Sequence, residues 1–151
     1  MPDNTGKRFS LRLPATLANL EEFRIFVTDG AVKAGMDEAR IMQITLAVEE
    51  AYTNICKYAY PSDPRDAELT CDLTGERALV IELADSGAPF DITAAELPDT
   101  GIPLEDRAIG GLGGLLIREM ADETQYRREG ARNILRLTFR PRSGADETEK
   151  N

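Results

Sequence analysis

The sequence predicts an α+β fold, a two-layer sandwich in which a mostly antiparallel, mixed sheet carries its helices on one face. Two observations lead to this prediction. Apolar residues recur with the two-residue period of a strand in some stretches and with the longer period of a helix in others. These stretches follow one another in the order β-α-α-β-β-loop-α-β-β. Most neighbouring strands in this order are joined by short turns and therefore form antiparallel hairpins, while the helices have to bury their apolar faces against one side of the sheet.

The first half of the chain consists of one predicted strand and two predicted helices. Residues 9–13 alternate between apolar and polar side chains, which is the period of a half-buried strand. The apolar residues of 17–27 return on one helical face, and this helix ends by Gly35. A second helix is expected to begin at Asp37, a good N-cap residue, and to run to about Ala59. Because it is apolar on more than one stripe, we expect it to be packed on most of its circumference.

The second half consists of two predicted hairpins, which a long loop and a short helix separate. Residues 86–111 show no regular period, and a loop of that length within a compact domain is usually functional. The expected elements are, in order, a strand over 69–73, a turn at 75–76, a strand over 78–84, the loop, a helix over 112–121, and strands over 124–128 and 133–140 that meet at a Glu129-Gly130 turn.

Length and composition indicate one soluble domain. We expect an N-terminal tail (1–6), a single domain (7–140) and a disordered polar C-terminal tail (141–151), because 151 residues suit one hydrophobic core. Neither a run of eighteen apolar residues nor a signal peptide is recognisable, so no membrane association is expected. Cys56 and Cys71 lie in periodic segments without ligand-like neighbours, which indicates buried free thiols and a cytoplasmic protein.

Charge and missing residue types exclude several classes of function. The 18 basic and 27 acidic residues give a net charge of −9, which argues against a nucleic-acid partner. The sequence contains no histidine, which excludes imidazole-ligated zinc, a Ser-His-Asp triad and a phosphohistidine relay within this chain. Any chemistry must therefore use carboxylates, amides, backbone groups and a metal or cofactor.

The first cluster of candidate residues lies on the second helix. Glu50 and Asn54 are four residues apart and project from one face, and Lys57 follows on the same side. A carboxylate can accept a proton from an incoming hydroxyl group, and an amide oxygen is a hard ligand that suits Mg²⁺. Taken alone, however, this pattern is more often the solvated polar stripe of an amphipathic helix.

The second cluster, Asp85-Ser86-Gly87-Ala88-Pro89-Phe90-Asp91, directly follows the strongest strand. Asp85 has the same parity as Leu83, so its carboxylate should point toward the core, where it needs a partner. An adenine amino group would satisfy this carboxylate, whereas the carbonyl that guanine has at the same position would not. Gly87 would leave room for the base to approach. The alternative is an ordinary Asp-Ser-Gly turn at the end of a strand.

The third cluster, Gly110-Gly111-Leu112-Gly113-Gly114, opens the short helix. Glycines at a helix N-terminus expose backbone N–H groups, and the helix dipole favours a phosphate there. A flexible hinge is the alternative. No strand immediately precedes the cluster and no Lys-Ser/Thr pair follows it, which distinguishes it from the dinucleotide-binding and P-loop arrangements.

The three clusters in this order resemble the ATP-binding Bergerat fold of the GHKL superfamily, which DNA gyrase, heat-shock chaperones, histidine kinases and MutL share. Within that superfamily the sequence is most similar to the bacterial anti-sigma-factor serine-protein kinases of sporulation and the general stress response. The similarity covers about residues 7–140. It is carried by the segments Ala47 to Asn54, Asp85 to Asp91, Gly110 to Ile117 and Met120 to Asp122.

The resemblance implies a role for each candidate residue. Glu50 would be the general base, Asn54 would ligate Mg²⁺ and contact the nucleotide, and Asp85 would bind the adenine amino group. Residues 91–113 would form a lid over ATP. The further residues of the nucleotide-binding site would be Gly87, Gly111 and Gly113.

Two positions depart from the pattern of the family. Tyr58 stands where histidine is usual, although tyrosine also occurs there in the wider superfamily. Gly114 stands where a bulky aliphatic residue is usual, so the lid hinge is expected to be looser. Neither departure removes a group that would contact ATP.

The resemblance implies an anti-sigma factor that is also an ATP-dependent serine/threonine-protein kinase, with ATP and Mg²⁺ as its cofactors. Its partners would be a sigma factor, a STAS-type anti-sigma-factor antagonist as the phosphorylation substrate, and a second copy of the chain in a homodimer. One alternative is a non-catalytic, nucleotide-gated partner-switching module, against which Glu50 argues, because such a module needs no general base. The ATPase fragment of a sensor histidine kinase is disfavoured, because only one strand and one helix precede the nucleotide clusters.

Overall fold

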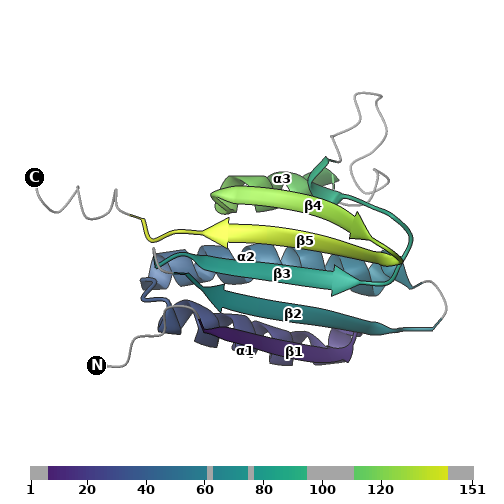
Figure 1. Cartoon of the computed structure of the whole chain (residues 1–151), viewed down its shortest axis with the longest axis horizontal. Helices are drawn as coiled ribbons and strands as arrows, with labels where there is room; N and C mark the ends of the chain where they lie inside the picture. Colours follow the sequence, from purple (N-terminus) through teal and green to yellow (C-terminus); the bar gives the residue numbers. More distant parts are fainter. Residues whose placement is uncertain (1–6, 61–62, 75–76, 95–110, 143–151) are drawn as a thin grey trace, which may run out of the picture.

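The computed structural model describes residues 7–60, 63–74, 77–94 and 111–142, and within them shows one five-stranded sheet with its helices on one face (Figure 1). The strand order is β1-β2-β3-β5-β4, and the four neighbouring pairs are all antiparallel. The predicted α+β sandwich is therefore confirmed. The sheet of the described residues departs from the prediction only in having no parallel pair.

The helices and strands follow the predicted order. The strands are β1 (Arg8–Pro14), β2 (Asp66–Leu73), β3 (Leu79–Asp85), β4 (Glu123–Glu129) and β5 (Arg132–Phe139). The α-helices are α1 (Leu20–Lys33), α2 (Glu38–Asn54) and α3 (Gly111–Met120). The described ranges also contain short helical segments: the 3-10 turns η1 (Leu17–Asn19) and η3 (Ile92–Ala94) and the π-helix η2 (Ile55–Ala59).

The hydrophobic core fills the layer between the sheet and the helices. Alternate residues of each strand face this layer, and the register pairs Leu69 with Leu83 and Leu83 with Leu135. On the helix side, the rings of Phe23 and Tyr52 lie with their centroids 4.4 Å apart. Because α2 contacts both α1 and α3, it is packed on several sides, as the sequence predicts.

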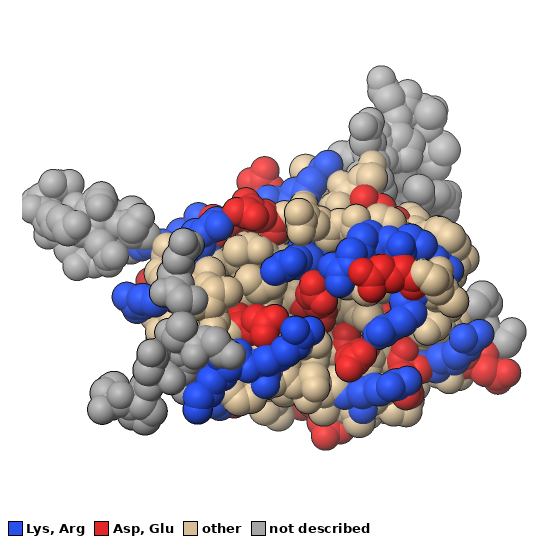
Figure 2. Space-filling model, viewed as in Figure 1, with Lys and Arg blue, Asp and Glu red and all other residues tan. Residues whose placement is uncertain are grey.

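The opposite face of the sheet carries charged side chains of both signs (Figure 2). Exposed pairs of this kind contribute at most about 1 kcal/mol each, so the sheet depends mainly on its backbone hydrogen bonds and its core. Ion pairs that connect different elements on this side are Arg12–Asp66 at 3.1 Å, Arg132–Glu68 at 2.8 Å and Arg127–Glu82 at 3.1 Å.

The helix predicted from Asp37 to Ala59 consists of two parts. It begins as predicted, because the side chain of Asp37 accepts a hydrogen bond of 2.8 Å from the backbone N–H of Arg40. The α-helical part ends at Asn54, and the chain continues as the π-helix η2. A π-helix holds more residues per turn than an α-helix, so the side chains after Asn54 point in other directions than an α-helix predicts.

Arg40 is a fully buried arginine near the start of α2. Its guanidinium donates hydrogen bonds to the carbonyl oxygen of Met120 (2.8 Å), the carboxylate of Asp122 (2.5 Å) and the carbonyl oxygen of Arg140 (2.9 Å). Burial lowers the pKa of Arg40, and the charge of Asp122 opposes this effect. Arg40 therefore ties α2 to the end of α3 and to the chain that leaves β5.

The structure also tests the cysteine predictions. Cys71 is buried as predicted, whereas Cys56 is only partly buried, and both are free thiols. Among the helices of the described ranges, none has the length and apolar character needed to cross a bilayer. The predictions that lie outside the described residues concern the turn at 75–76, residues 95–110 of the lid, and the tails 1–6 and 143–151.

Candidate functional site

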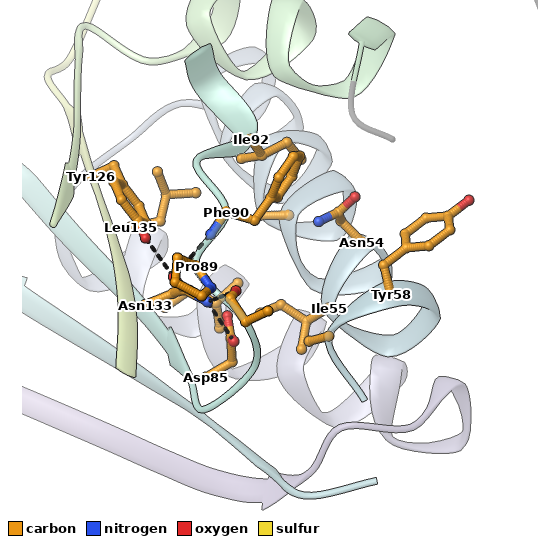
Figure 3. Close-up of a pocket in the computed structure, with 14 residues that line it drawn as sticks. Asn54, Ile55, Tyr58, Asp85, Pro89, Phe90, Ile92, Tyr126, Asn133 and Leu135 are labelled. Carbon is orange, nitrogen blue, oxygen red and sulfur yellow. Dashed lines mark hydrogen bonds between the residues drawn. The ribbon is translucent and has the colours of Figure 1, made fainter. Parts of the chain in front are cut away.

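A cavity of about 260 Å³ is lined by residues of α2, η2, β3, β4 and β5 and of the segment that follows β3 (Figure 3). Most of its walls are apolar. Apolar walls with a few well-placed polar groups are the usual form of a small-molecule site. The polar side chains that line this cavity come from separate parts of the sequence: Asn54, Tyr58, Asp85, Tyr126 and Asn133.

Asp85 lies at the end of β3 with only 7% of its surface exposed, which confirms that its side chain points inward. Its Oδ1 atom accepts hydrogen bonds from the backbone N–H of Gly87 (2.8 Å) and from the side-chain amide of Asn133 (3.0 Å). The chain therefore supplies two of the donors that this buried carboxylate needs. No described residue donates a hydrogen bond to Oδ2, so one oxygen of Asp85 stays available to a ligand in the cavity.

Asn133 is a site residue that the sequence analysis missed. It is buried on β5, directly opposite Asp85 in the strand register. Its side-chain NH₂ group donates to Asp85 and to the carbonyl oxygen of Ala88 (2.9 Å), as Figure 3 shows for Asp85. Its parity could have revealed it, because Asn133 shares the inward face of Leu135 and Leu137 and is polar there.

Arg128 on β4 was also missed. Its guanidinium donates hydrogen bonds to the carbonyl oxygen of Gly87 (2.8 Å) and to Oδ1 of Asn133 (3.1 Å). It thus connects the edge strand β4 to the turn after β3. Its sequence context carries no signal for this role, because a charged residue on an edge strand is ordinarily solvated.

Gly87 has a close neighbour within the chain. A Cβ atom at this position would lie 2.8 Å from both the Cβ atom and the carbonyl oxygen of Ala59, at the end of η2. Contacts that short do not occur between real side chains and backbone, so the turn after β3 reaches η2 only because residue 87 is glycine. The structure therefore gives Gly87 a packing role in addition to the predicted room for a base.

Glu49 and Glu50 point toward different helices. The carboxylate of Glu49 pairs with Arg24 of α1 at 3.2 Å. Glu50 instead lies beside the first turn of α3. A Cβ atom placed on Gly113 would be only 3.0 Å from Oε1 of Glu50. Asn54, one turn after Glu50, lines the cavity. The first and third predicted clusters therefore meet at the start of α3, and the first and second meet in the cavity.

A comparison with protein-family models matches residues 13–139 to the histidine kinase-like ATPase domain. The chain belongs to the histidine kinase-like ATPases. Among curated proteins it is similar to the serine-protein kinase RsbW of Listeria monocytogenes, with 31% identity over 134 residues that cover 85% of each chain. This similarity places it within the RsbW family of that superfamily. The serine/threonine-protein kinase BtrW of Bordetella bronchiseptica is 35% identical over 96 residues, which cover 63% of this chain and 67% of BtrW.

Solved structures show the same fold. The RsbU and RsbW domains of Rv1364c from Mycobacterium tuberculosis superpose on 88% of this chain and 32% of that one, with a TM-score of 0.65 and 16% identity. The SiaB–SiaC complex from Pseudomonas aeruginosa matches 87% of this chain and 88% of the other, with a TM-score of 0.60 and 17% identity. Identities this low support the fold alone, and the family rests on the sequence comparisons.

The structure corrects the predicted direction of one side chain in this histidine kinase-like ATPase and shows the place of another. Lys57 is exposed and does not line the cavity, because the π-helical turn rotates it away from the direction that an α-helix gives. Tyr58, which stands at the usual histidine position, lines the cavity and is 50% exposed.

Gly114 was expected to loosen the hinge of the lid, and the structure shows a close packing contact at this position. A Cβ atom at Gly114 would lie 2.1 Å from the carbonyl oxygen of Ile92. The helix α3 therefore packs directly on the backbone of η3, and any larger residue would push the two apart. In this histidine kinase-like ATPase the glycine allows a close contact at the start of α3.

Proposed function

We propose that this chain is a cytoplasmic anti-sigma factor that uses ATP to phosphorylate a serine or threonine of a STAS-type antagonist. One observation supports the proposal above all others: candidate residues from three distant segments meet pairwise around the end of α2. Asn54 and Asp85 line a common cavity, and Glu50 lies beside Gly113. The names of the curated relatives RsbW and BtrW, which are serine- and serine/threonine-protein kinases, support the same reaction class.

The base of the nucleotide enters the cavity in this proposal. The free Oδ2 atom of Asp85 accepts a hydrogen bond from the adenine amino group, which guanine lacks at that position. The apolar side chains of Ile55, Ile92 and Leu135 flank the base. A mainly apolar cavity with one correctly placed acceptor binds a purine and selects among purines by the same contact.

The phosphates lie toward the first turn of α3. The backbone N–H groups at the start of a helix lack partners within the helix, and the helix dipole adds a partial positive charge there. Gly111 and Gly113 leave this backbone open to a phosphate. Residues 91–94 and 111–113 would be the two ends of the lid, whose central part, 95–110, lies outside the described residues.

Asn54 fits a magnesium ion that accompanies the phosphates. Its amide oxygen is a hard ligand on the cavity wall, and Mg²⁺ is commonly held by one or two protein ligands together with substrate phosphates and water. The described residues contain no group of three acidic, cysteine or histidine side chains that would hold a metal without a nucleotide. When bound, Mg²⁺ would neutralise part of the phosphate charge, and replacement of Asn54 should abolish Mg²⁺-dependent nucleotide binding.

Glu50 acts as the general base. No described residue donates a hydrogen bond to its carboxylate, in contrast to the ion-paired Glu49, so Glu50 is available to an incoming hydroxyl group. It accepts the hydroxyl proton as the substrate oxygen forms a bond to the γ-phosphorus. The bond from the γ-phosphorus to the bridging oxygen breaks at the same time, and ADP leaves.

The test is phosphate transfer to a purified STAS-type antagonist, followed by mass spectrometry. Glu50→Gln should keep ATP affinity and lower the transfer rate by about 10²–10⁴-fold, the usual contribution of a general base. Glu49→Gln is the matched control and should change transfer little. Full transfer by Glu50→Gln would favour the nucleotide-gated binding module, and equal losses from both variants would mean that the wrong helix face was assigned.

The proposed partners are a sigma factor and the antagonist, and the proposed assembly is a homodimer. Light scattering of the purified chain measures the assembly directly: the monomer has a mass of 16.6 kDa, and the proposal requires twice that value. Binding of a sigma factor in the presence and absence of ATP and Mg²⁺ tests the anti-sigma role separately from the kinase role.

A further inference from the structure

Asn133, near the start of β5, makes several hydrogen bonds around the cavity. It is only 6% exposed and stands opposite Asp85 in the β3–β5 register. A buried side-chain amide has to satisfy two donors and an acceptor within the protein. The hydrogen-bond partners of the Asn133 amide therefore determine which way its oxygen and its NH₂ group point.

Three donors surround the oxygen of the Asn133 side chain. Oδ1 accepts hydrogen bonds from the hydroxyl group of Tyr126 (2.5 Å) and the backbone N–H of Phe90 (3.2 Å), which Figure 3 shows. It also accepts a hydrogen bond from the guanidinium of Arg128 (3.1 Å). A flipped amide would place its own N–H groups against the Arg128 and Phe90 N–H groups, which can only donate. The surroundings therefore allow one orientation, with the NH₂ group directed toward Asp85 and the carbonyl oxygen of Ala88.

This orientation determines what Asp85 presents to the cavity. Oδ1 of Asp85 already accepts from Asn133 (3.0 Å) and from the backbone N–H of Gly87 (2.8 Å). These two hydrogen bonds to Oδ1 fix the orientation of the carboxylate plane. The other oxygen is left to face a ligand, and an ionised carboxylate offers that ligand an acceptor only.

We propose that Asn133 is a positioning residue that determines the base specificity of the site by fixing the Asp85 carboxylate as an acceptor for the exocyclic amino group of adenine. The inference rests on the proposed nucleotide binding. The inference goes beyond the proposed nucleotide binding because it assigns the selectivity for adenine to a network of Tyr126, Arg128 and Asn133, and not to Asp85 alone.

The experiment compares two nucleotides on the full chain by calorimetry: ATP, and purine riboside triphosphate, which is ATP without its 6-amino group. The wild type should bind ATP about ten- to a hundredfold more tightly than the analogue, the value of a hydrogen bond to a charged group. Asn133→Ala should reduce this ratio to about threefold or less, because a rotating carboxylate no longer meets the amino group. The affinity for the analogue should change much less than the affinity for ATP.

If Asn133 had only a structural role, Asn133→Ala would change the affinities for ATP and for the analogue by the same factor. Their ratio would then stay unchanged, and that result would overturn the inference. Tyr126→Phe serves as a second variant if Asn133→Ala does not fold: it keeps the ring and removes one donor that orients Asn133, so it should lower the same ratio by a smaller factor. Arg136→Ala, on the same strand but on the charged face, should leave the ratio at its wild-type value.

The two proposals fail in different ways. If the wild type binds ATP and the analogue equally, the adenine contact of Asp85 and the role of Asn133 are both wrong. If the wild type discriminates and both variants discriminate equally well, the nucleotide site stands and only the role of Asn133 is wrong.

Discussion

Asp85 is the residue at which a single atom should decide which nucleotide binds. In Asp85→Asn the side-chain oxygen should remain with its two donors, Gly87 and Asn133, so the new NH₂ group would face the cavity. A donor would then meet the amino group of adenine, and we expect ATP binding to weaken by about 1.5–3 kcal/mol. The same donor suits the carbonyl group of guanine, so GTP binding should not fall in parallel.

Calorimetry with both nucleotides on both proteins measures this change. Equal binding of ATP and GTP by the wild type, or normal ATP binding by Asp85→Asn, would remove the adenine assignment. Thermal unfolding of the variant without nucleotide is the control, because the substitution keeps both internal hydrogen bonds.

The sequence predicted the site residues unevenly. Asp85 could be predicted because a polar residue in the inward parity of a strand is a local signal. The same rule applied to β5 would have found Asn133. Arg40 and Arg128 could not be found in this way, since the carbonyl groups that they reach in other elements lie 80 to 100 residues away for Arg40 and 41 residues away for Arg128. Only the folded sheet brings these groups together.

At the scale of secondary-structure elements, the contact between α3 and η3 is the feature most sensitive to substitution. Gly114→Ala would place a Cβ atom 2.1 Å from the carbonyl oxygen of Ile92, which belongs to the rigid backbone. We expect a net loss of about 1–3 kcal/mol in the free energy of unfolding, even though alanine is the better helix former. Urea unfolding measures this loss.

Gly113→Ala is the matched substitution one position earlier. Its Cβ atom would lie 3.0 Å from the flexible end of the Glu50 side chain, which can move aside. The free energy of unfolding should change little, while phosphate transfer should fall about ten- to a hundredfold because the carboxylate is displaced. A stable Gly114→Ala together with an unstable Gly113→Ala would mean that the start of α3 lies elsewhere.

The elements themselves were largely predictable because their patterns are local. The strand alternation and the N-cap at Asp37 set the positions of β1 and α2, and Gly130 allows the β4–β5 turn, where its φ angle is +59°. The π-helix η2 was not predictable. Its hydrogen-bond pattern accompanies a tertiary contact, the approach of Gly87 to Ala59, that no local pattern contains.

For the whole molecule, we expect a loss of stability at alkaline pH, because burial raises the pKa values of two cysteine thiols and one tyrosine hydroxyl group. Burial raises the pKa of the Cys71 thiol from its ordinary 9.0 to about 12, with smaller effects of Asp72 and Asp29 in the same direction. Above pH 9 the unfolded chain loses this proton while the folded chain keeps it, so stability is complete below pH 9 and falls between pH 9 and 12. Burial also raises the pKa values of Cys56 and Tyr52.

Urea unfolding at pH 8 and pH 10 tests this prediction. Cys71 alone should account for a loss of about 1 kcal/mol at pH 10. Cys71→Ala should show a shallower decline between the two pH values, whatever its stability at pH 8. An identical decline in both proteins would show that the Cys71 thiol ionises in the folded state as easily as in the unfolded chain.

Arg40 links the most distant parts of the chain and should therefore affect the stability of the whole molecule. Its buried guanidinium satisfies the carbonyl groups of Met120 and Arg140 and the carboxylate of Asp122. Arg40→Gln would break the ion pair with Asp122 and remove the guanidinium donor from the two carbonyl groups, and we expect the free energy of unfolding to fall by about 3–5 kcal/mol. Arg12→Gln, which breaks an exposed pair with Asp66, should change the free energy of unfolding by at most about 1 kcal/mol.

Urea unfolding of both variants tests this prediction. If the two substitutions have the same effect, the contacts of Arg40 do not hold α2, α3 and β5 together. A loss of stability in Arg40→Gln alone would show that these buried contacts hold α2 to the end of α3 and to the chain after β5.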